Sequence, residues 1–123
     1  MKTQRQKRGA MAYHAGCAAE ESVAGRYERS GLDIVARRWR GKSGEVDLIA
    51  RDGDGYVFVE VKKSASHAQA AQRLTGRQIA RIFDAATEFV GGTVLGLAAQ
   101  MRFDVALVDA AGRIEILENA LAA

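Results

Sequence analysis

The chain has 123 residues, of which 48% are apolar and 27% are charged, and its formal net charge is +3. This length supports one domain with a single hydrophobic core, and the composition excludes a disordered chain. No apolar run approaches the roughly 18 residues of a membrane span and the N-terminus lacks the apolar segment of a secretory signal, so we expect no membrane association.

The positive charge is concentrated in the first third of the chain. Residues 1–44 contain ten of the 18 Lys and Arg residues but only four of the 15 Asp and Glu residues. Residues 45–123 contain the remaining eight basic and eleven acidic residues. One basic group around Trp39 consists of Arg37, Arg38, Arg40 and Lys42. Such clusters suit a polyanion such as nucleic acid, although a solubilising tail followed by a solvated edge strand explains the charge equally well.

The first expected element is a helix from about Ala12 to Ser30, preceded by a flexible basic tail at residues 1–11; residues 12–123 are expected to form the single domain. One face of this helix carries residues at spacings of four, three and four, namely Gly16, Glu20, Val23 and Tyr27. This spacing is typical of an amphipathic helix, and Gly31 favours its termination. Cys17 lies in the same helix; as the only cysteine it excludes an internal disulfide and favours a reducing cytoplasm.

Three strands are expected next. Residues 32–39 form the first, and a turn at Gly41–Gly44 leads into a β-hairpin at residues 44–63 with its reversal at residues 52–55. That reversal pairs residue i with residue 107 − i. The apolar face of the hairpin then contains the pairs Val46–Val61, Leu48–Val59 and Ala50–Val57. The opposite face contains the pairs Ile49–Phe58, Asp47–Glu60 and Glu45–Lys62.

The C-terminal half predicts a second helix and two further strands. Residues 64–74 are polar and are expected to form a loop with some helical character, in which His67, like His14, lacks zinc-ligand spacing. Thr75 and Gln78 have the spacing of a capping box. The apolar stripe of the helix that follows consists of Ile79, Ile82, Phe83, Ala86, Phe89 and Val90. With strands at residues 101–109 and 113–117, the order predicts an α/β fold with a mixed sheet flanked by helices.

The hairpin register places one acid opposite another. Cross-strand Cβ atoms lie roughly 4.5–5.5 Å apart, so the like charges of Asp47 and Glu60 would destabilise the strand pair. A Mg²⁺ ion would relieve this repulsion, and Lys62, on the same face, can hold a water molecule against a phosphate. The structural alternative is a solvated face with an ion pair between Glu45 and Lys62.

These residues resemble the PD-(D/E)xK nuclease superfamily, which has the restriction-endonuclease-like fold, with an Asp on one strand and Glu-x-Lys on its hairpin partner. Over nearly the whole chain, the stretches GCAAEESVAGRY, GEVDLIARDGDGYVFVEVK and RFDVALVD are similar to the YraN-like family of bacterial proteins. That family is related in architecture to Holliday-junction resolvases. The resemblance therefore implies the fold order α-β-β-β-α-β, with an optional last strand.

The resemblance also implies roles for individual residues. Asp47 and Glu60 match the metal-binding acids, Lys62 matches the catalytic lysine, and Glu20 matches an acid of the first helix that completes the metal site in resolvase-like members. An ion pair with an arginine of the first strand would account for Glu20 equally well. Glu45 is a further candidate ligand or a partner of Lys62.

The chain departs from the family pattern around the site. Val46 replaces the proline before Asp47, and Lys63 and Ser64 stand where relatives tend to have Thr and Arg. Gln78 matches a polar position that faces the site in such nucleases. The residues expected to contact nucleic acid are Arg37, Arg38, Arg40, Lys42, Lys63, Arg73 and Arg77.

The functional expectation is a cytoplasmic endonuclease that uses Mg²⁺ or Mn²⁺ and acts on nucleic acid, with structured or branched DNA as the expected substrate. One alternative is a nucleic-acid-binding protein that keeps the fold but has little activity of its own. A more distant alternative is a structural module whose charged hairpin contacts other proteins. The resolvase resemblance leaves a homodimer open.

Overall fold

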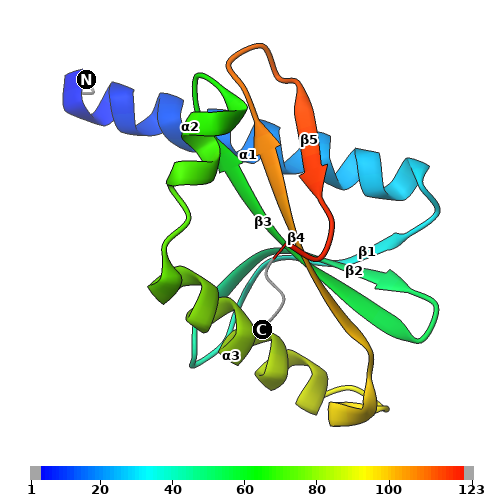
Figure 1. The fold of residues 1–123 in the computed structure, drawn as a ribbon. Helices are drawn as coiled ribbons and strands as arrows, with labels where there is room; N and C mark the ends of the chain where they lie inside the picture. The colour runs from blue at the N-terminus through cyan, green and yellow to red at the C-terminus, as the bar shows by residue number, and fades with distance from the viewer. Residues whose placement is uncertain (1–3, 121–123) are drawn as a thin grey trace.

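A computed structural model describes residues 4–120, with side chains from Cys17 onward. The core element is a five-stranded mixed sheet in the order β1-β2-β3-β4-β5 (Figure 1). The strands are β1 (Asp33–Arg40), β2 (Glu45–Asp52), β3 (Gly55–Lys63), β4 (Met101–Val108) and β5 (Ile114–Leu117). β3 and β4 are parallel and the other neighbours are antiparallel. The predicted restriction-endonuclease-like α/β architecture is confirmed.

Helices cover both faces of the sheet (Figure 1). They are α1 (Gln4–Arg29), α2 (His67–Gln72) and α3 (Gly76–Gly91), with a short 3₁₀ helix, η1, at Gly96–Ala98. α1 packs Val23 and Tyr27 against Leu48 and Val59 on one face. α3 packs Ile82 and its apolar stripe against the other face, which contains Ile49 and Phe58. Within residues 4–120, no helix is both long enough and apolar enough to cross a membrane.

Most element boundaries match the sequence predictions. α1 starts at Gln4, so the basic segment predicted as a tail is helical from that residue; residues 1–3 lie outside the described part of the chain. The capping box of α3 is formed in full, because Thr75 Oγ1 accepts from Gln78 N and Gln78 Oε1 accepts from Thr75 N, each at 3.2 Å. α2 supplies the helical character expected within residues 64–74.

The predicted hairpin register is confirmed only from the reversal to the middle of the hairpin. β2 and β3 pair from Asp52 with Gly55 to Leu48 with Val59, as 107 − i requires. The predicted pairs at residues 45–47 are wrong, because the ladder ends at Leu48. Val46 also changes face: it packs in the α3 cluster, whereas Leu48 packs in the α1 cluster. The regular alternation of side chains is therefore broken at Asp47.

A buried carboxylate on β4 joins three distant parts of the chain. Asp104 is fully buried and accepts hydrogen bonds from Tyr27 Oη at 2.7 Å, from Arg102 at 2.8 and 2.9 Å, and from the Asn119 backbone N–H at 2.9 Å. Burial and the hydrogen bond to Asp104 raise the pKa of Tyr27 above its ordinary value. A buried charge is tolerated only when it is paired and hydrogen-bonded. The Asp of the RFDV stretch is thus explained by its contacts with the end of α1 and the C-terminal segment.

We expect Asp104→Ala to lower the free energy of unfolding by about 3–5 kcal/mol, because it leaves the Arg102 guanidinium and the Tyr27 hydroxyl without their acceptor. Tyr27→Phe is the control, since it removes one hydrogen bond and should cost about 1 kcal/mol. Urea unfolding followed by circular dichroism measures both values. Equal losses in the two variants would contradict the anchoring role of Asp104.

Candidate functional site

The site forms where β2 and β3 separate. In a regular antiparallel ladder the Val61 N–H would bond a backbone carbonyl of β2. Instead it donates to Asp47 Oδ2 at 2.8 Å. The Asp47 side chain therefore replaces a ladder hydrogen bond at this point, and its carboxylate lies between the two strands.

Asp47 and Glu60 line the same pocket, which has a volume of about 700 Å³. Glu45 also lines it, so three of the acids named in the sequence analysis border one space. The pocket is bounded by the β1–β2 turn at residues 41–44 and by the first half of α3, which contributes Gln78 and Arg81. The hairpin strands and these two segments thus enclose an acidic recess.

Lys62 is fixed by an ion pair with the neighbouring acid. Lys62 Nζ lies 2.9 Å from Glu60 Oε1, and their side chains are only 15% and 12% exposed. They point to the same face because they are two residues apart on a strand. The alternative ion pair between Glu45 and Lys62 does not form, since Glu45 instead contacts Arg40 at 3.2 Å.

The environment of Asp47 opposes its ionisation. Burial raises its pKa from the ordinary value of 3.8 to about 7, with the negative charges of Glu60 and Glu20 adding to the rise. The hydrogen bond from Val61 and the charge of Lys62 act in the opposite direction without cancelling it. Desolvation and like charge are the two effects expected when carboxylates are brought together in a partly buried position.

Glu20 is held by an arginine of the first strand. Its Oε2 accepts from Arg38 Nε at 2.8 Å, and a second Arg38 nitrogen lies 2.8 Å from Cys17 Sγ. The ion-pair alternative for Glu20 is thus the arrangement observed, and Glu20 is not among the residues that line the pocket. Arg38 has a φ of 50°, a left-handed conformation that non-glycine residues seldom adopt and that often occurs at functional sites.

Of the three acids that line the pocket, Asp47 and Glu60 are the two that could hold a cation between them, because Glu45 pairs with Arg40. Among the described residues, no three His, Cys, Asp or Glu side chains are placed to hold a metal ion by themselves. Mg²⁺ sites at phosphate-processing centres use one or two carboxylates and complete their octahedron with water and substrate phosphate. Asp47 and Glu60 fit that donor chemistry, and a cation between them would offset both the burial of the Asp47 carboxylate and its repulsion by Glu60, the two main causes of its raised pKa.

The basic residues predicted to contact nucleic acid are divided between two surfaces. Arg37 contacts Glu21 at 2.8 Å and Glu28 at 3.9 Å, so it lies against α1, as does Arg38. Arg40 and Lys42 border the pocket. Arg73 donates to the Lys63 backbone carbonyl at 2.8 Å, which links the loop before α3 to the end of β3. Arg77 lies one turn before Arg81 on α3.

Sequence reasoning missed two residues beside the pocket. Arg81 lines it, and Glu88 accepts from the backbone N–H groups of Lys42 and Ser43. These hydrogen bonds lower the pKa of Glu88. The spacing of Arg77, Arg81 and Glu88 by four and seven residues placed them on one helix face. Nothing in the sequence showed that this face contacts the β1–β2 turn.

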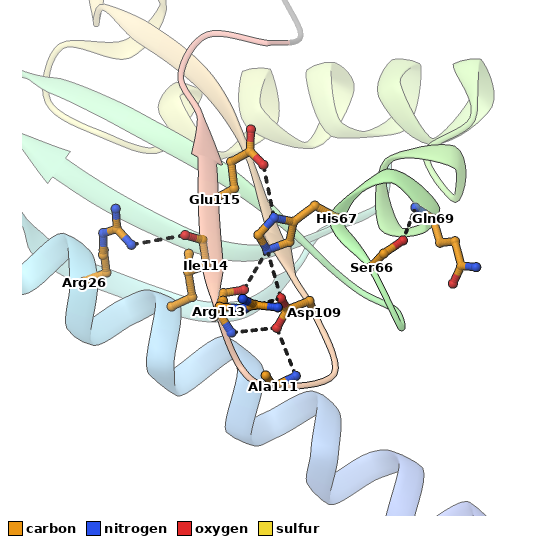
Figure 2. Close-up of polar contacts among 9 residues, drawn as sticks. All are labelled: Arg26, Ser66, His67, Gln69, Asp109, Ala111, Arg113, Ile114 and Glu115. Atoms are coloured by element: carbon orange, nitrogen blue, oxygen red, sulfur yellow. Dashed lines mark hydrogen bonds and ion pairs between the residues drawn. The ribbon is translucent and has the colours of Figure 1, made fainter.

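His67 lies outside the pocket in a separate polar cluster (Figure 2). Its Nε2 is 2.8 Å from the Arg113 carbonyl oxygen and its Nδ1 is 3.1 Å from a Glu115 carboxylate oxygen. Asp109 beside it accepts from Arg113 Nε at 2.8 Å and closes the β4–β5 turn. His67, which lacks zinc-ligand spacing in the sequence, thus links the start of α2 to the β4–β5 turn and to β5. The side chain of His14 lies outside the described residues.

The element order and the five-stranded mixed sheet define a restriction-endonuclease-like α/β protein. The model of the Uncharacterised protein family UPF0102, also called the YraN family, matches residues 19–108, and the chain belongs to this family. A UPF0102 protein of Cereibacter sphaeroides strain KD131 is 61% identical over 94% of this chain and 98% of its own length. A UPF0102 protein of Ruegeria pomeroyi is 56% identical over 92% of this chain and 92% of its own length. A UPF0102 protein of Dinoroseobacter shibae is 47% identical over 94% of this chain and 86% of its own length.

The raised pKa of Asp47 predicts how the stability of the protein depends on pH. A folded-state pKa above the unfolded value stabilises the fold when the group is protonated, below about pH 4, and this contribution is lost as the pH rises to about 7. Asp47→Asn removes the ionisable group but keeps an oxygen that can accept from Val61. Without metal, the variant should therefore be more stable than the parent at about pH 8, by on the order of 1 kcal/mol or more.

Thermal and urea unfolding from about pH 4 to pH 8 test this prediction, and the difference between parent and variant should vanish at the acidic end. Asp52→Asn is the matched control, because Asp52 is an exposed acid of the same strand. A variant that is less stable than the parent at every pH would mean that the Asp47 carboxylate stabilises the fold.

Proposed function

We propose that this protein is a metal-dependent endonuclease that hydrolyses phosphodiester bonds of nucleic acid, with structured or branched DNA as its substrate. The observation that carries the proposal is that two partly buried acids, Asp47 and Glu60, line one pocket and that Glu60 is ion-paired with Lys62. This arrangement costs stability, because the hydrogen bond from Val61 and the charge of Lys62 do not cancel the effects of burial and like charge on Asp47. Such costs are typical of sites kept for function.

Each residue has a role that follows from its chemistry. Asp47 and Glu60 would hold Mg²⁺ or Mn²⁺, which supplies stabilisation of the charge that develops on the phosphate. Lys62 would orient a water molecule for in-line attack; its ammonium lies 2.9 Å from Oε1 of Glu60, one of the acids that line the pocket, although Lys62 is not itself a lining residue. Glu45, which lines the pocket from the start of β2 and pairs with Arg40, would be a further ligand of the cation.

A nucleic-acid-binding protein with little activity is the second candidate. It is favoured by the position of Glu20, because the acid expected to complete the metal site is held by Arg38 instead. In that case the acidic recess would keep its shape without turnover. The cleavage experiment below separates these two candidates.

Incubation with labelled linear, flapped and four-way-junction DNA and Mg²⁺ or Mn²⁺ tests for activity. We expect cleavage by the parent and a loss of at least about 100-fold in Asp47→Asn and in Lys62→Met, since each removes a group that acts on the reacting phosphate. Asp52→Asn should cleave like the parent. Binding of these DNAs by the parent without any cleavage would favour the second candidate.

Thermal melts with added Mg²⁺ test the metal site without using activity. A ligand that binds only the folded state stabilises it by about 2.7 kcal/mol at 100 times its dissociation constant. The parent should show a Mg²⁺-dependent rise in melting temperature, and Asp47→Asn and Glu60→Gln should show a much smaller one. An equal rise in all three proteins would mean that Mg²⁺ binds elsewhere.

A further inference from the structure

We infer that Lys42, Arg77 and Arg81 form the surface that binds the phosphates of a nucleic-acid duplex on either side of the cleaved bond, and that Arg37 and Arg38 do not contribute. This inference rests on the proposed function, because it assigns the substrate contacts of the same pocket. It revises the expectation that the arginines of the first strand form the docking surface.

The β1–β2 turn is fastened to α3, which places its lysine beside the arginines of that helix. Glu88 of α3 accepts from Lys42 N at 3.0 Å and from Ser43 N at 3.2 Å. A Cβ at Gly44 would lie 3.3 Å from the Arg81 carbonyl oxygen, so the other end of the turn also contacts the helix. The turn therefore lies along α3 between Arg81 and Glu88.

Gly41 permits this close approach. A Cβ at that position would collide with the carboxylate of Glu88 and with the ring of Trp39. The absence of a side chain thus lets the turn reach the helix. As a result the positions of Lys42 and Arg81, both of which line the pocket, are fixed relative to Asp47 and Glu60.

The cations on the two surfaces differ in how far their charge is neutralised. Arg37 pairs with Glu21 and Glu28, and Arg38 pairs with Glu20, so α1 offsets the charge of both arginines. In the described part of the chain, none of the ion pairs involves Lys42, Arg77 or Arg81.

The charge of Lys42 does act on Glu88, but that carboxylate is already hydrogen-bonded to the backbone of the turn. The three cations are also exposed. They are therefore available to a polyanion, whose counterions they would release on binding.

The arrangement of charge around the pocket suits a phosphodiester chain. Acids lie inside the recess, where a cation and the phosphate to be cleaved would meet, and cations lie on its α3 side and on the turn. Positive groups beside an acidic centre can hold the neighbouring phosphates of the same strand and so orient the central one.

The aromatic residues of this face favour a duplex over an unpaired strand. Proteins that bind single strands stack bases on exposed aromatic rings. Here the half-buried ring of Trp39 packs edge-on against Phe89, with 5.5 Å between the ring centroids. Tyr56 packs edge-on against the same ring, with 5.3 Å between the centroids. Phe83 likewise packs against Phe103 at 4.3 Å. Within residues 17–120 these rings on the α3 face pack against one another. The contacts that this face offers are therefore contacts with the phosphate backbone of the nucleic acid, which do not read its sequence.

Equilibrium binding of fluorescently labelled DNA by the full chain, in EDTA to prevent cleavage, tests the inference. Arg81→Gln and Lys42→Gln should each weaken binding of a mixed-sequence duplex by about tenfold at low salt. Each should also reduce the slope of log K against log salt by about 0.9, which is the effect of one phosphate contact on duplex DNA. The loss should be the same for unrelated duplex sequences, and the parent should bind duplex more tightly than a single strand of equal length.

Arg37→Gln and Arg51→Gln are matched controls, because each also removes one positive charge from an exposed arginine. Arg51 donates to Gly53 at the far end of the β2–β3 hairpin, and Arg37 lies against α1. Both controls should retain the affinity and the salt slope of the parent. Melting temperatures of all four variants would show whether any change in affinity reflects unfolding.

The outcomes separate this inference from the proposed function. If the parent binds duplex and Arg37→Gln weakens binding as much as Arg81→Gln does, the surface assigned here is wrong while the proposed function stands. Tighter binding of single strands than of duplexes would overturn the assigned substrate class. If the parent binds neither form of DNA at low salt, the proposed function itself fails.

Discussion

The half-buried carboxylate of Asp47 beside Glu60 is the constraint on which the rest of the site depends. An ionised group in this position is destabilised by burial and by its neighbour, which is why its pKa rises to about 7. Three features limit the cost: the N–H of Val61 binds one carboxylate oxygen, Lys62 neutralises Glu60, and Arg38 neutralises Glu20. The separation of β2 and β3 exists because Asp47 takes the place of a ladder hydrogen bond.

The fold contains a second buried carboxylate with the opposite character. Asp104 accepts four hydrogen bonds, from a tyrosine, an arginine and a backbone N–H, and joins α1 to β4 and the C-terminal segment. Among the described residues, Asp47 accepts a hydrogen bond from the Val61 N–H alone, and it lines a pocket together with a second acid, Glu60. A buried carboxylate whose oxygens all accept hydrogen bonds is typical of a structural role. A carboxylate that accepts few hydrogen bonds and lies beside a like charge is a candidate ligand for a cation. The contrast within one small domain supports reading the pocket as functional.

The regular elements could be predicted from the sequence because their causes are local. The apolar stripe of α3 and the capping box of Thr75 and Gln78 depend only on residues within a few positions of each other, and both are observed. The hairpin register followed from its reversal and held as far as Leu48. Beyond Leu48 the predicted register failed, because the Asp47 side chain accepts the hydrogen bond of the Val61 N–H. A register counted from the length of the reversal considers only backbone pairing and does not include such a side-chain acceptor.

The sequence by itself determined the fold order, the family resemblance, and the acids and lysine that the hairpin could bring together. Only the tertiary structure decided their partners. In the structure Glu20 pairs with Arg38 and Lys62 pairs with Glu60. The backbone of the β1–β2 turn donates to Glu88 of α3. The tertiary structure also separated Arg37 and Arg38, which pair with acids of α1, from Lys42 and Arg81, which line the pocket and take part in no ion pair among the described residues. The physical reason is that an ion pair or hydrogen bond depends on distance through space. The sequence left two roles open for Glu20, and it did not indicate that Glu88 would meet the backbone of Lys42, 46 positions away.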